Sequence, residues 1–173
     1  GLYGAFVVEE PTPPIAATEH MLILDDWRLT SEGAIDSDSF GSLDDAIAEG
    51  RMGNWFTVNG VYRPHLKGPA KGLIRLRALN VANVRTMSVQ FRGADPWIIA
   101  RDGQPVAPAH IGTVPLKLAP GQRADLMIEA GSELVSMALD LTPVRRSSAP
   151  WRSCSAPKTM DFPTTGKATM SRP

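Results

Sequence analysis

Hydrophobic and polar residues alternate with a period of two along much of the middle of the chain. The alternation is clearest where Ile74, Leu76 and Ala78 are interleaved with Arg75 and Arg77. A period of two indicates strands with one buried face. Alternating segments and short apolar runs predict strands over residues 4–8, 20–24, 55–58, 74–79, 87–92, 97–100, 114–118, 123–129 and 134–141.

Turn-forming residues separate these segments. Asn59-Gly60 and Asp102-Gly103 each follow an apolar run, and such dipeptides favour tight reversals of the chain. Short strands at this spacing predict an all-β Greek-key sandwich.

Only one segment has the signals of a helix. Residues 30–41 are polar and read as a loop, and residues 42–50 follow with Ser42 at a capping position. Asp44 and Asp45 suit the positive end of a helix, and Gly50 suits its termination. The pattern therefore predicts one short helix inside a long insertion, with Leu43 and Ile47 on the same face.

The last part of the chain differs in character from the rest. Residues 1–141 contain 12 Lys and Arg and 17 Asp and Glu, whereas residues 142–173 contain 6 basic residues and 1 acidic residue. This tail also contains five Pro, five Ser and five Thr, without a period of 2 or 3.6. Such a segment buries too little to offset its ordering entropy, so we predict that it is disordered.

Composition narrows the class of protein. A length of 173 residues suggests one domain, and a formal net charge of zero argues against nucleic acid as the main partner. The single cysteine, Cys154, excludes an internal disulfide. No apolar run approaches the roughly 18 residues of a membrane-spanning helix.

The histidines are the first candidates for a metal site. A copper centre needs imidazole and thiolate ligands that converge in one pocket. His20, His65 and His110 lie far apart, no His-x-His pair occurs, and Cys154 lies in the tail. We therefore predict structural or surface roles for them, no catalytic residue and no metal ligand.

Two groups of charged residues were weighed for function. Asp25 and Asp26 are adjacent at a strand end, so they point to opposite faces and do not form a catalytic pair. Arg75 and Arg77 share one face of a strand, with further arginines nearby. Such a stripe can bind an anion, pair with carboxylates or line a contact between domains. The arginines nearby are Arg85 and Arg92. The carboxylates with which the stripe can pair across a sheet edge are Asp102 and Asp125.

Methionines and aromatic residues are predicted to fill the core. The methionines are scattered singly, unlike a cluster of thioether ligands for copper(I). Three aromatic residues are expected in the core or at a domain interface. These residues are Met21, Met52, Met87, Met127, Met137, Trp55, Phe56 and Trp97.

Several short motifs, taken in order, carry a resemblance to a known family. They are Gly1-Leu2-Tyr3-Gly4, Leu24-Asp25-Asp26-Trp27, Val58-Asn59-Gly60, Arg75-Leu76-Arg77-Ala78-Leu79-Asn80, Ile99-Ala100-Arg101-Asp102-Gly103-Gln104-Pro105 and Pro120-Gly121-Gln122-Arg123-Ala124-Asp125-Leu126. In this order and spacing, the chain up to about Leu141 resembles the middle cupredoxin domain of a three-domain multicopper oxidase. That family includes laccases, metal oxidases and bacterial copper-tolerance oxidases.

The resemblance implies a domain organisation and the absence of copper from this chain. Residues 1–10 correspond to the last strand of a missing first cupredoxin domain, 11–19 to a proline-rich linker and 20–141 to the middle cupredoxin-like domain. Residues 142–173 match nothing in the family, and we expect non-homologous sequence there, as from a frameshift. In this family the copper ligands lie in the first and third domains, so none is expected here.

The resemblance also implies a function for the intact parent. A multicopper oxidase oxidises phenols or metal ions and reduces oxygen to water, and its middle domain is a structural spacer. This chain alone is therefore expected to be inactive and to have the first and third domains as its partners. Oligomerisation is expected through apolar surface left exposed near residues 4–8 and Trp97. The family also implies a periplasmic or extracellular location.

Two alternatives remain open. Some family members keep the three domains without the copper ligands and act as scaffold or binding proteins at the cell envelope. The chain can also be a self-standing binding module that uses an exposed sheet face. The middle domain carries no ligand in either kind of parent, so this sequence does not separate them.

Overall fold

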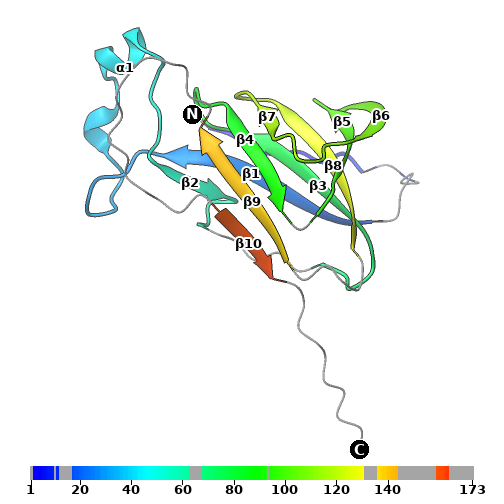
Figure 1. Ribbon diagram of the computed structural model, residues 1–173. Helices are drawn as coiled ribbons and strands as arrows, with labels where there is room; N and C mark the ends of the chain where they lie inside the picture. Colours follow the sequence, from blue (N-terminus) through cyan, green and yellow to red (C-terminus); the bar gives the residue numbers. More distant parts are fainter. Residues whose placement is uncertain are drawn as a thin grey trace, which may run out of the picture.

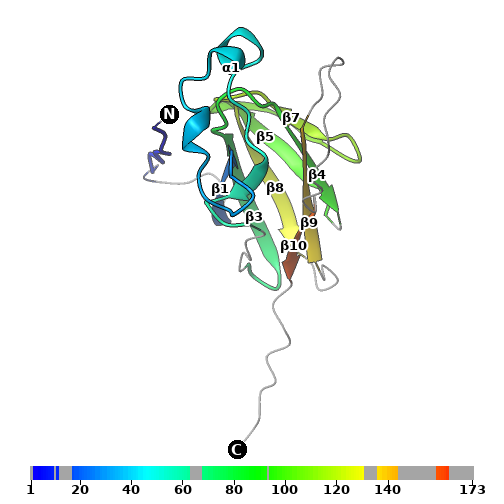
Figure 2. The same cartoon turned by 90° about the vertical axis from the view of Figure 1, so that its left-hand side faces the viewer.

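Two β-sheets face each other and enclose the core of the chain (Figures 1 and 2). The computed structural model describes residues 2–9, 11, 17–62, 68–92, 94–130, 136–143 and 159–163. Within them, the larger sheet has the strand order β2-β1-β3-β8-β5-β6 and the smaller sheet the order β10-β9-β4-β7. The predicted all-β sandwich is therefore confirmed.

The larger sheet combines sequence neighbours and distant segments. Strands β1 and β3 pair in parallel, and the other pairs are antiparallel. The parallel pair requires a crossover, which is made by the insertion and by β2. The strands of this sheet are β1 (Thr18–Trp27), β2 (Trp55–Val58), β3 (Gly72–Asn80), β5 (Trp97–Arg101), β6 (Gln104–His110) and β8 (Arg123–Ala130).

The smaller sheet covers the inner face of the larger one. All of its pairs are antiparallel, and β4 lies between β9 and β7. Its strands are β4 (Met87–Arg92), β7 (Leu116–Leu118), β9 (Ser136–Pro143) and β10 (Thr159–Pro163).

The alternation in sequence sets the core between the sheets. Leu22, Leu76 and Leu126 of the larger sheet and Met87 and Leu118 of the smaller sheet are at most 1% exposed. They belong to one continuous apolar cluster. Each strand thus turns one face inward, as a period of two requires. The prediction that methionine fills the core is confirmed for Met87. Met127 is 7% exposed but lies outside the core cluster, opposite Arg75 in the strand register, and Met21 and Met52 are only partly buried.

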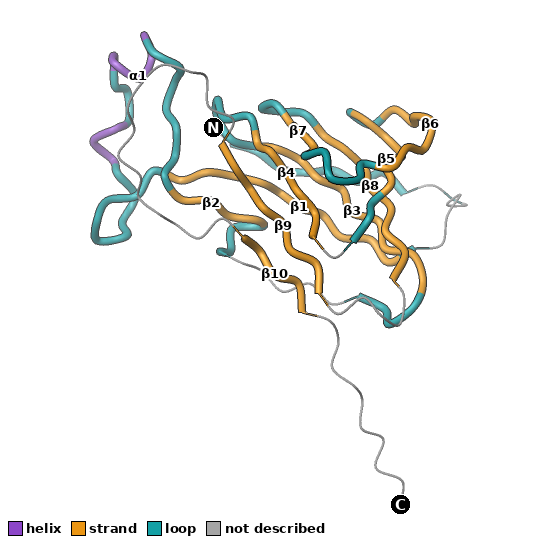
Figure 3. Tube along the Cα trace, viewed as in Figure 1, coloured by secondary structure: helices purple, strands orange, loops and turns teal. Residues whose placement is uncertain are grey.

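Within the described residues, helical structure is confined to the insertion between β1 and β2 (Figure 3). It comprises the short 3-10 helix η1 (Ser37–Ser39) and the helix α1 (Leu43–Ile47). The Ser42 hydroxyl accepts a hydrogen bond from the backbone amide of Asp45 at 3.2 Å. This confirms the predicted cap, although α1 ends before Gly50.

At the edges of the sheets, the sequence missed one strand and extended another too far. Strand β6 was not predicted, because its two prolines and exposed side chains show no apolar alternation. It lies at an edge of the sheet, where prolines are tolerated because one row of backbone amides faces solvent. The strand predicted at 114–118 is shorter, since only Leu116–Leu118 pair with β4.

The predictions for the two ends of the chain also change. Residues 4–8 form no strand, and they belong to neither sheet. Within the tail, Thr159–Pro163 form β10 against β9, which the prediction of disorder missed. The other residues from 144 onward lie outside the described part of the chain, and the predicted domain boundaries stay predictions.

One buried polar side chain ties the two sheets together. Asn80, at the end of β3, is fully buried, and its amide donates to the carbonyl oxygens of Arg85 at 2.7 Å and Leu118 at 2.8 Å. Its side-chain oxygen accepts from the amide of Ala82 at 3.0 Å. Three backbone groups around the core thus depend on one side chain.

Within the described residues, no helix is long and apolar enough to cross a membrane.

Candidate functional site

The two histidines among the described residues, His20 and His110, do not share a metal site. His20 lies in β1 and His110 at the end of β6, four strand spacings apart in the same sheet. At about 4.8 Å per spacing this separates them by roughly 19 Å, whereas ligands of one metal ion lie within a few ångströms of it. The described residues contain no group of three or more His, Cys, Asp or Glu that could hold a metal ion. The described residues therefore do not fit a copper ion, which the resemblance assigns to the other domains of the parent.

Each described histidine has its own surroundings. The Nδ1 atom of His110 lies 2.9 Å from an Asp95 carboxylate oxygen, and its ring lies against Trp97 with centroids 3.5 Å apart. His110 is the last residue of β6. The Nε2 atom of His20 is buried without a hydrogen-bond partner in the described structure. His65 and Cys154 lie outside the described residues.

Asp25 and Asp26 act separately, as the sequence predicted. Both lie inside β1, which continues to Trp27, so the expectation that they end the strand is wrong. Asp25 accepts a hydrogen bond from the Tyr3 hydroxyl at 2.8 Å. Asp26 accepts from the Arg85 guanidinium and from the backbone amide of Gly53, each at 2.7 Å.

The contact between Tyr3 and Asp25 fixes the N-terminal segment, residues 2–9, to the sheet. Burial raises the pKa of Asp25, although the hydrogen bond from Tyr3 opposes the rise. Burial and the same hydrogen bond raise the pKa of Tyr3 to about 12. A raised carboxyl pKa means that the folded state holds the Asp25 proton more tightly than the unfolded chain does.

This shift predicts a pH dependence of stability. The stabilising contribution of Asp25 is complete below its pKa in the unfolded chain and is lost as pH rises through its higher folded pKa. We expect the free energy of unfolding of the natural chain to fall over this rise relative to Asp25→Asn, which cannot ionise. Urea denaturation at a series of pH values measures the difference. The exposed Asp38→Asn is the control, and a difference between Asp25→Asn and the natural chain that does not change with pH would contradict the prediction.

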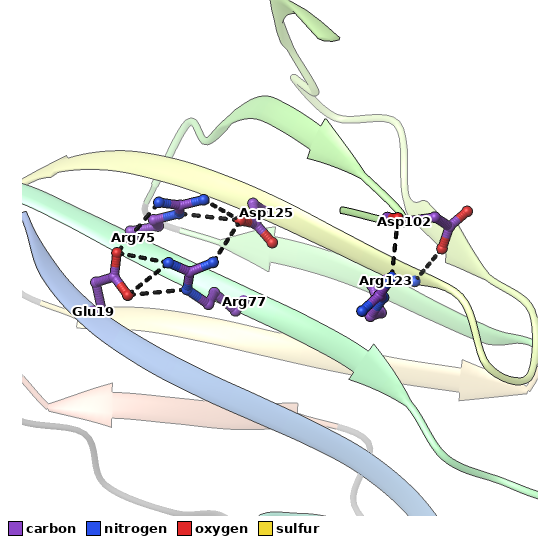
Figure 4. A network of polar contacts seen from close by, with 6 residues as sticks. All are labelled: Glu19, Arg75, Arg77, Asp102, Arg123 and Asp125. Carbon is purple, nitrogen blue, oxygen red and sulfur yellow. Dashed lines mark hydrogen bonds and ion pairs between the residues drawn. The ribbon is translucent and has the colours of Figure 1, made fainter. Parts of the chain in front are cut away.

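A network of four charged side chains covers the outer face of the larger sheet (Figure 4). Arg75 and Arg77 of β3 both donate to Asp125 of β8 and to Glu19 of β1. The Arg77 Nε and Nη2 atoms lie 3.0 and 2.9 Å from the two Glu19 oxygens. Strand register produces the network, since Glu19 lies opposite Arg75 and Arg77 lies opposite Asp125.

These contacts decide among the alternatives for the arginine stripe. The predicted pairing with Asp125 is confirmed, and the charges of two arginines and two carboxylates balance. The pairing of these arginines with Asp102 is wrong, because Asp102 accepts from the backbone amide of Arg123 across the turn after β5 (Figure 4). A stripe that is already neutralised offers little to an anion. The side chain of Arg92 lies outside the described part.

A groove of about 1070 Å³ separates this network from the N-terminal segment, residues 2–9. One wall is the chain from Gly4 to Glu9, and the other includes Glu19, Arg75 and Arg77. The Phe6 and Val8 side chains are 97% and 89% exposed. Apolar side chains thus face solvent while charged side chains are half-buried. This is typical of a surface that another domain or another protein chain covers.

The aromatic residues divide between core and surface. Phe56 packs against the core cluster, and the Arg85 guanidinium lies 5.1 Å from the centre of its ring. Trp55 and Trp97 remain 36% and 40% exposed. The exposure of Phe6 and Trp97 agrees with the expectation of apolar surface near residues 4–8 and Trp97.

Comparisons with known proteins place this domain among relatives of two descriptions. No family model matches the chain. The cell division protein FtsP of Photorhabdus laumondii is 32% identical over 142 residues, which are 77% of this chain and 28% of that protein. FtsP of Escherichia coli K12 is 29% identical over 136 residues, 75% of this chain and 27% of that protein. The chain thus spans little more than a quarter of the length of these relatives.

The second group of similar proteins consists of solved structures of multicopper oxidases. A multi-copper oxidase from Pseudomonas thermotolerans superposes with a TM-score of 0.65 at 31% identity, over 73% of this chain and 31% of that one. Fet3p, a multicopper oxidase that functions in iron import, gives a TM-score of 0.71 over 97% of this chain and 31% of that one. Its 15% identity supports the fold alone.

Proposed function

Since the chain is a cupredoxin-like domain of the multicopper oxidase family, we propose that it is the middle, structural domain of a longer envelope protein and carries no copper ligand of its own. Its work is to hold flanking domains in position. The groove under residues 2–9, the neutralised network beside it and the exposed Trp97 are the surfaces that such domains would cover. Without flanking domains, the same surfaces would favour oligomerisation of the chain.

For the parent protein we propose a scaffold role in cell division. The observation that carries this is the similarity to FtsP proteins, which extends over 75–77% of this chain. A scaffold places no demand on this domain for metal ligands or an acid–base pair. An extracytoplasmic location belongs to the same proposal.

A multicopper oxidase is the second candidate for the parent. It is favoured by the Pseudomonas thermotolerans oxidase, whose identity to this chain is close to that of the FtsP proteins. In such a parent, ligands in other domains would hold the copper, which would supply the oxidation of the substrate and the reduction of oxygen. The part of this chain described here would only position those domains.

Deletion of the parent gene separates the two candidates. If the parent is a scaffold for division, the deletion strain should form chains or filaments of undivided cells. Its envelope extract should keep its copper-dependent oxidation of a phenolic substrate. Normal division together with loss of that oxidation would contradict the scaffold and support the oxidase. Sequencing the parent gene upstream of Gly1 adds a direct check, because an oxidase needs a His-x-His pair there.

A further inference from the structure

The insertion between β1 and β2, residues 28–54, projects beyond one end of the sandwich (Figures 1 and 2). It carries four large apolar side chains that the described structure leaves exposed, and Ile35 is the least exposed of them at 52%. Phe40, Leu43 and Ile47 are 61%, 71% and 74% exposed. Leu43 and Ile47 lie one turn apart on the same face of α1. Phe40, Leu43 and Ile47 are called the insertion patch below.

Two arginines, Arg28 and Arg51, hold the insertion patch in place. Arg28 makes a forked ion pair with Asp45 and donates its Nε to the carbonyl oxygen of Met52 at 2.9 Å. Arg51 donates to the Ser39 hydroxyl at 2.8 Å, and its guanidinium lies 4.5 Å from the ring centre of Phe40. Both legs of the loop are therefore fixed, so a ligand would bind without first ordering it.

The charge around the insertion patch selects the kind of ligand. Residues 31–50 contain six Asp and Glu and neither Lys nor Arg. Asp45 is neutralised by Arg28. Asp38, Asp44 and Glu49 are exposed and have no ion pair among the described residues. An apolar patch with unpaired carboxylates around it complements a surface where cations surround apolar side chains.

We propose that the insertion patch is a docking site for a basic amphipathic segment of a partner protein, one that carries Lys or Arg beside apolar side chains. Phosphate-rich partners are disfavoured, because the same carboxylates repel nucleic acid and anionic lipid. The site is separate from the groove under residues 2–9, and it does not depend on whether the parent is a scaffold or an oxidase.

The test uses the full chain and a defined probe. The probe is a fluorescein-labelled amphipathic peptide of about 14 Leu and Lys residues, enough for close to four helical turns. Its counterpart has Glu in place of Lys. We expect the Lys peptide to bind, and the Glu peptide to bind at least about tenfold more weakly. Raising NaCl from about 0.05 to about 0.5 M should weaken the binding of the Lys peptide, since exposed charges are screened.

Variants locate the binding. A double variant and a triple variant should each weaken binding of the Lys peptide about tenfold, or about 1.4 kcal/mol. The double variant combines Leu43→Ser and Ile47→Ser. The triple variant combines Asp38→Asn, Asp44→Asn and Glu49→Gln. Val114→Ser is the matched control, because Val114 is 69% exposed and follows β6 at the opposite edge of the larger sheet from β2. It should leave the dissociation constant unchanged within about twofold. Since all these side chains lie outside both sheets and all are exposed, circular dichroism should show every variant folded.

Several outcomes would overturn the proposal. Equal binding of the Lys and Glu peptides would remove the role of charge. If the Lys peptide binds the double variant and the triple variant as tightly as it binds the natural chain, its binding site lies elsewhere. Binding to phosphatidylglycerol vesicles that is lost in Leu43→Ser with Ile47→Ser would identify a membrane as the occupant. Sedimentation that shows self-association abolished by the same change would identify a second copy of the chain.

Discussion

Replacing Arg85 by methionine is expected to lower the free energy of unfolding by about 3–5 kcal/mol, the usual effect of breaking a buried ion pair. The Asp26 side chain is 2% exposed and that of Arg85 is 12% exposed. Arg85 also donates to the carbonyl oxygen of Gly53 at 2.6 Å. Without the guanidinium, the Asp26 charge stays buried without its main partner, and the chain that leads from the insertion into β2 loses its anchor.

Chemical denaturation of three variants measures this effect. Arg101→Met is the control, because Arg101 is exposed at the end of β5. It should change the free energy of unfolding by no more than about 0.5 kcal/mol. Arg85→Met with Asp26→Asn removes both charges and should recover part of the loss. If Arg85→Met and Arg101→Met lower the free energy of unfolding by the same amount, the buried pair does not stabilise the fold.

Replacing Asn80 by alanine is expected to lower the free energy of unfolding by about 3–5 kcal/mol. Each buried polar group left without a partner costs about 1–3 kcal/mol. Asn80 serves the carbonyl oxygens of Arg85 and Leu118 and the amide of Ala82. The fully buried side chain would also leave a cavity, which adds to the loss.

Asn59 provides the matched comparison in the same denaturation experiment. Its side chain also bonds two backbone groups, the amide of Ile23 at 2.8 Å and the carbonyl oxygen of Met21 at 2.9 Å, but it is exposed. Asn59 has φ of 54°, so glycine keeps the left-handed backbone. Because water can replace both bonds, Asn59→Gly should lose less than about 1 kcal/mol. Equal losses at both positions would mean that burial does not set the importance of Asn80.

The fold was predictable where one face of a strand is buried and the other is not. Strands β3, β4 and β8 show the period of two because their alternate side chains enter the core. The turns after β2 and β5 were predictable because Asn59 and Asp102 adopt positive φ before glycine. Strand β6 was not, because an exposed edge strand with two prolines has no apolar face to signal it.

The site was predictable only where strand register brings charges together. The face shared by Arg75 and Arg77 follows from alternation, and Asp125 was a reasonable partner in a later strand. Nothing in the sequence pointed to Arg85 and Asp26 as a pair, because they are 59 positions apart and depend on how the insertion folds back. The exposure of Leu43 and Ile47 was equally hidden, since a shared helix face is usually a buried one.

The distribution of paired groups and exposed surface agrees with the supporting role that we propose for this domain. The charges of Glu19, Arg75, Arg77 and Asp125 are paired with one another. Asp25 and Asp26 in β1 bind separate partners, and the described histidines lie far apart. The apolar surface that stays exposed to solvent consists of side chains in residues 2–9, Trp97 and the insertion patch. Such a distribution suits a domain whose work is to hold other parts of a larger protein.

Copper content tests this account most directly. The full chain would be reconstituted with excess copper, desalted and subjected to elemental analysis. We predict near-zero copper, because His20 and His110 lie on strands too far apart to share an ion. One stoichiometric copper with a strong blue absorption would contradict the account. It would require Cys154 and two of the three histidines to converge in one site.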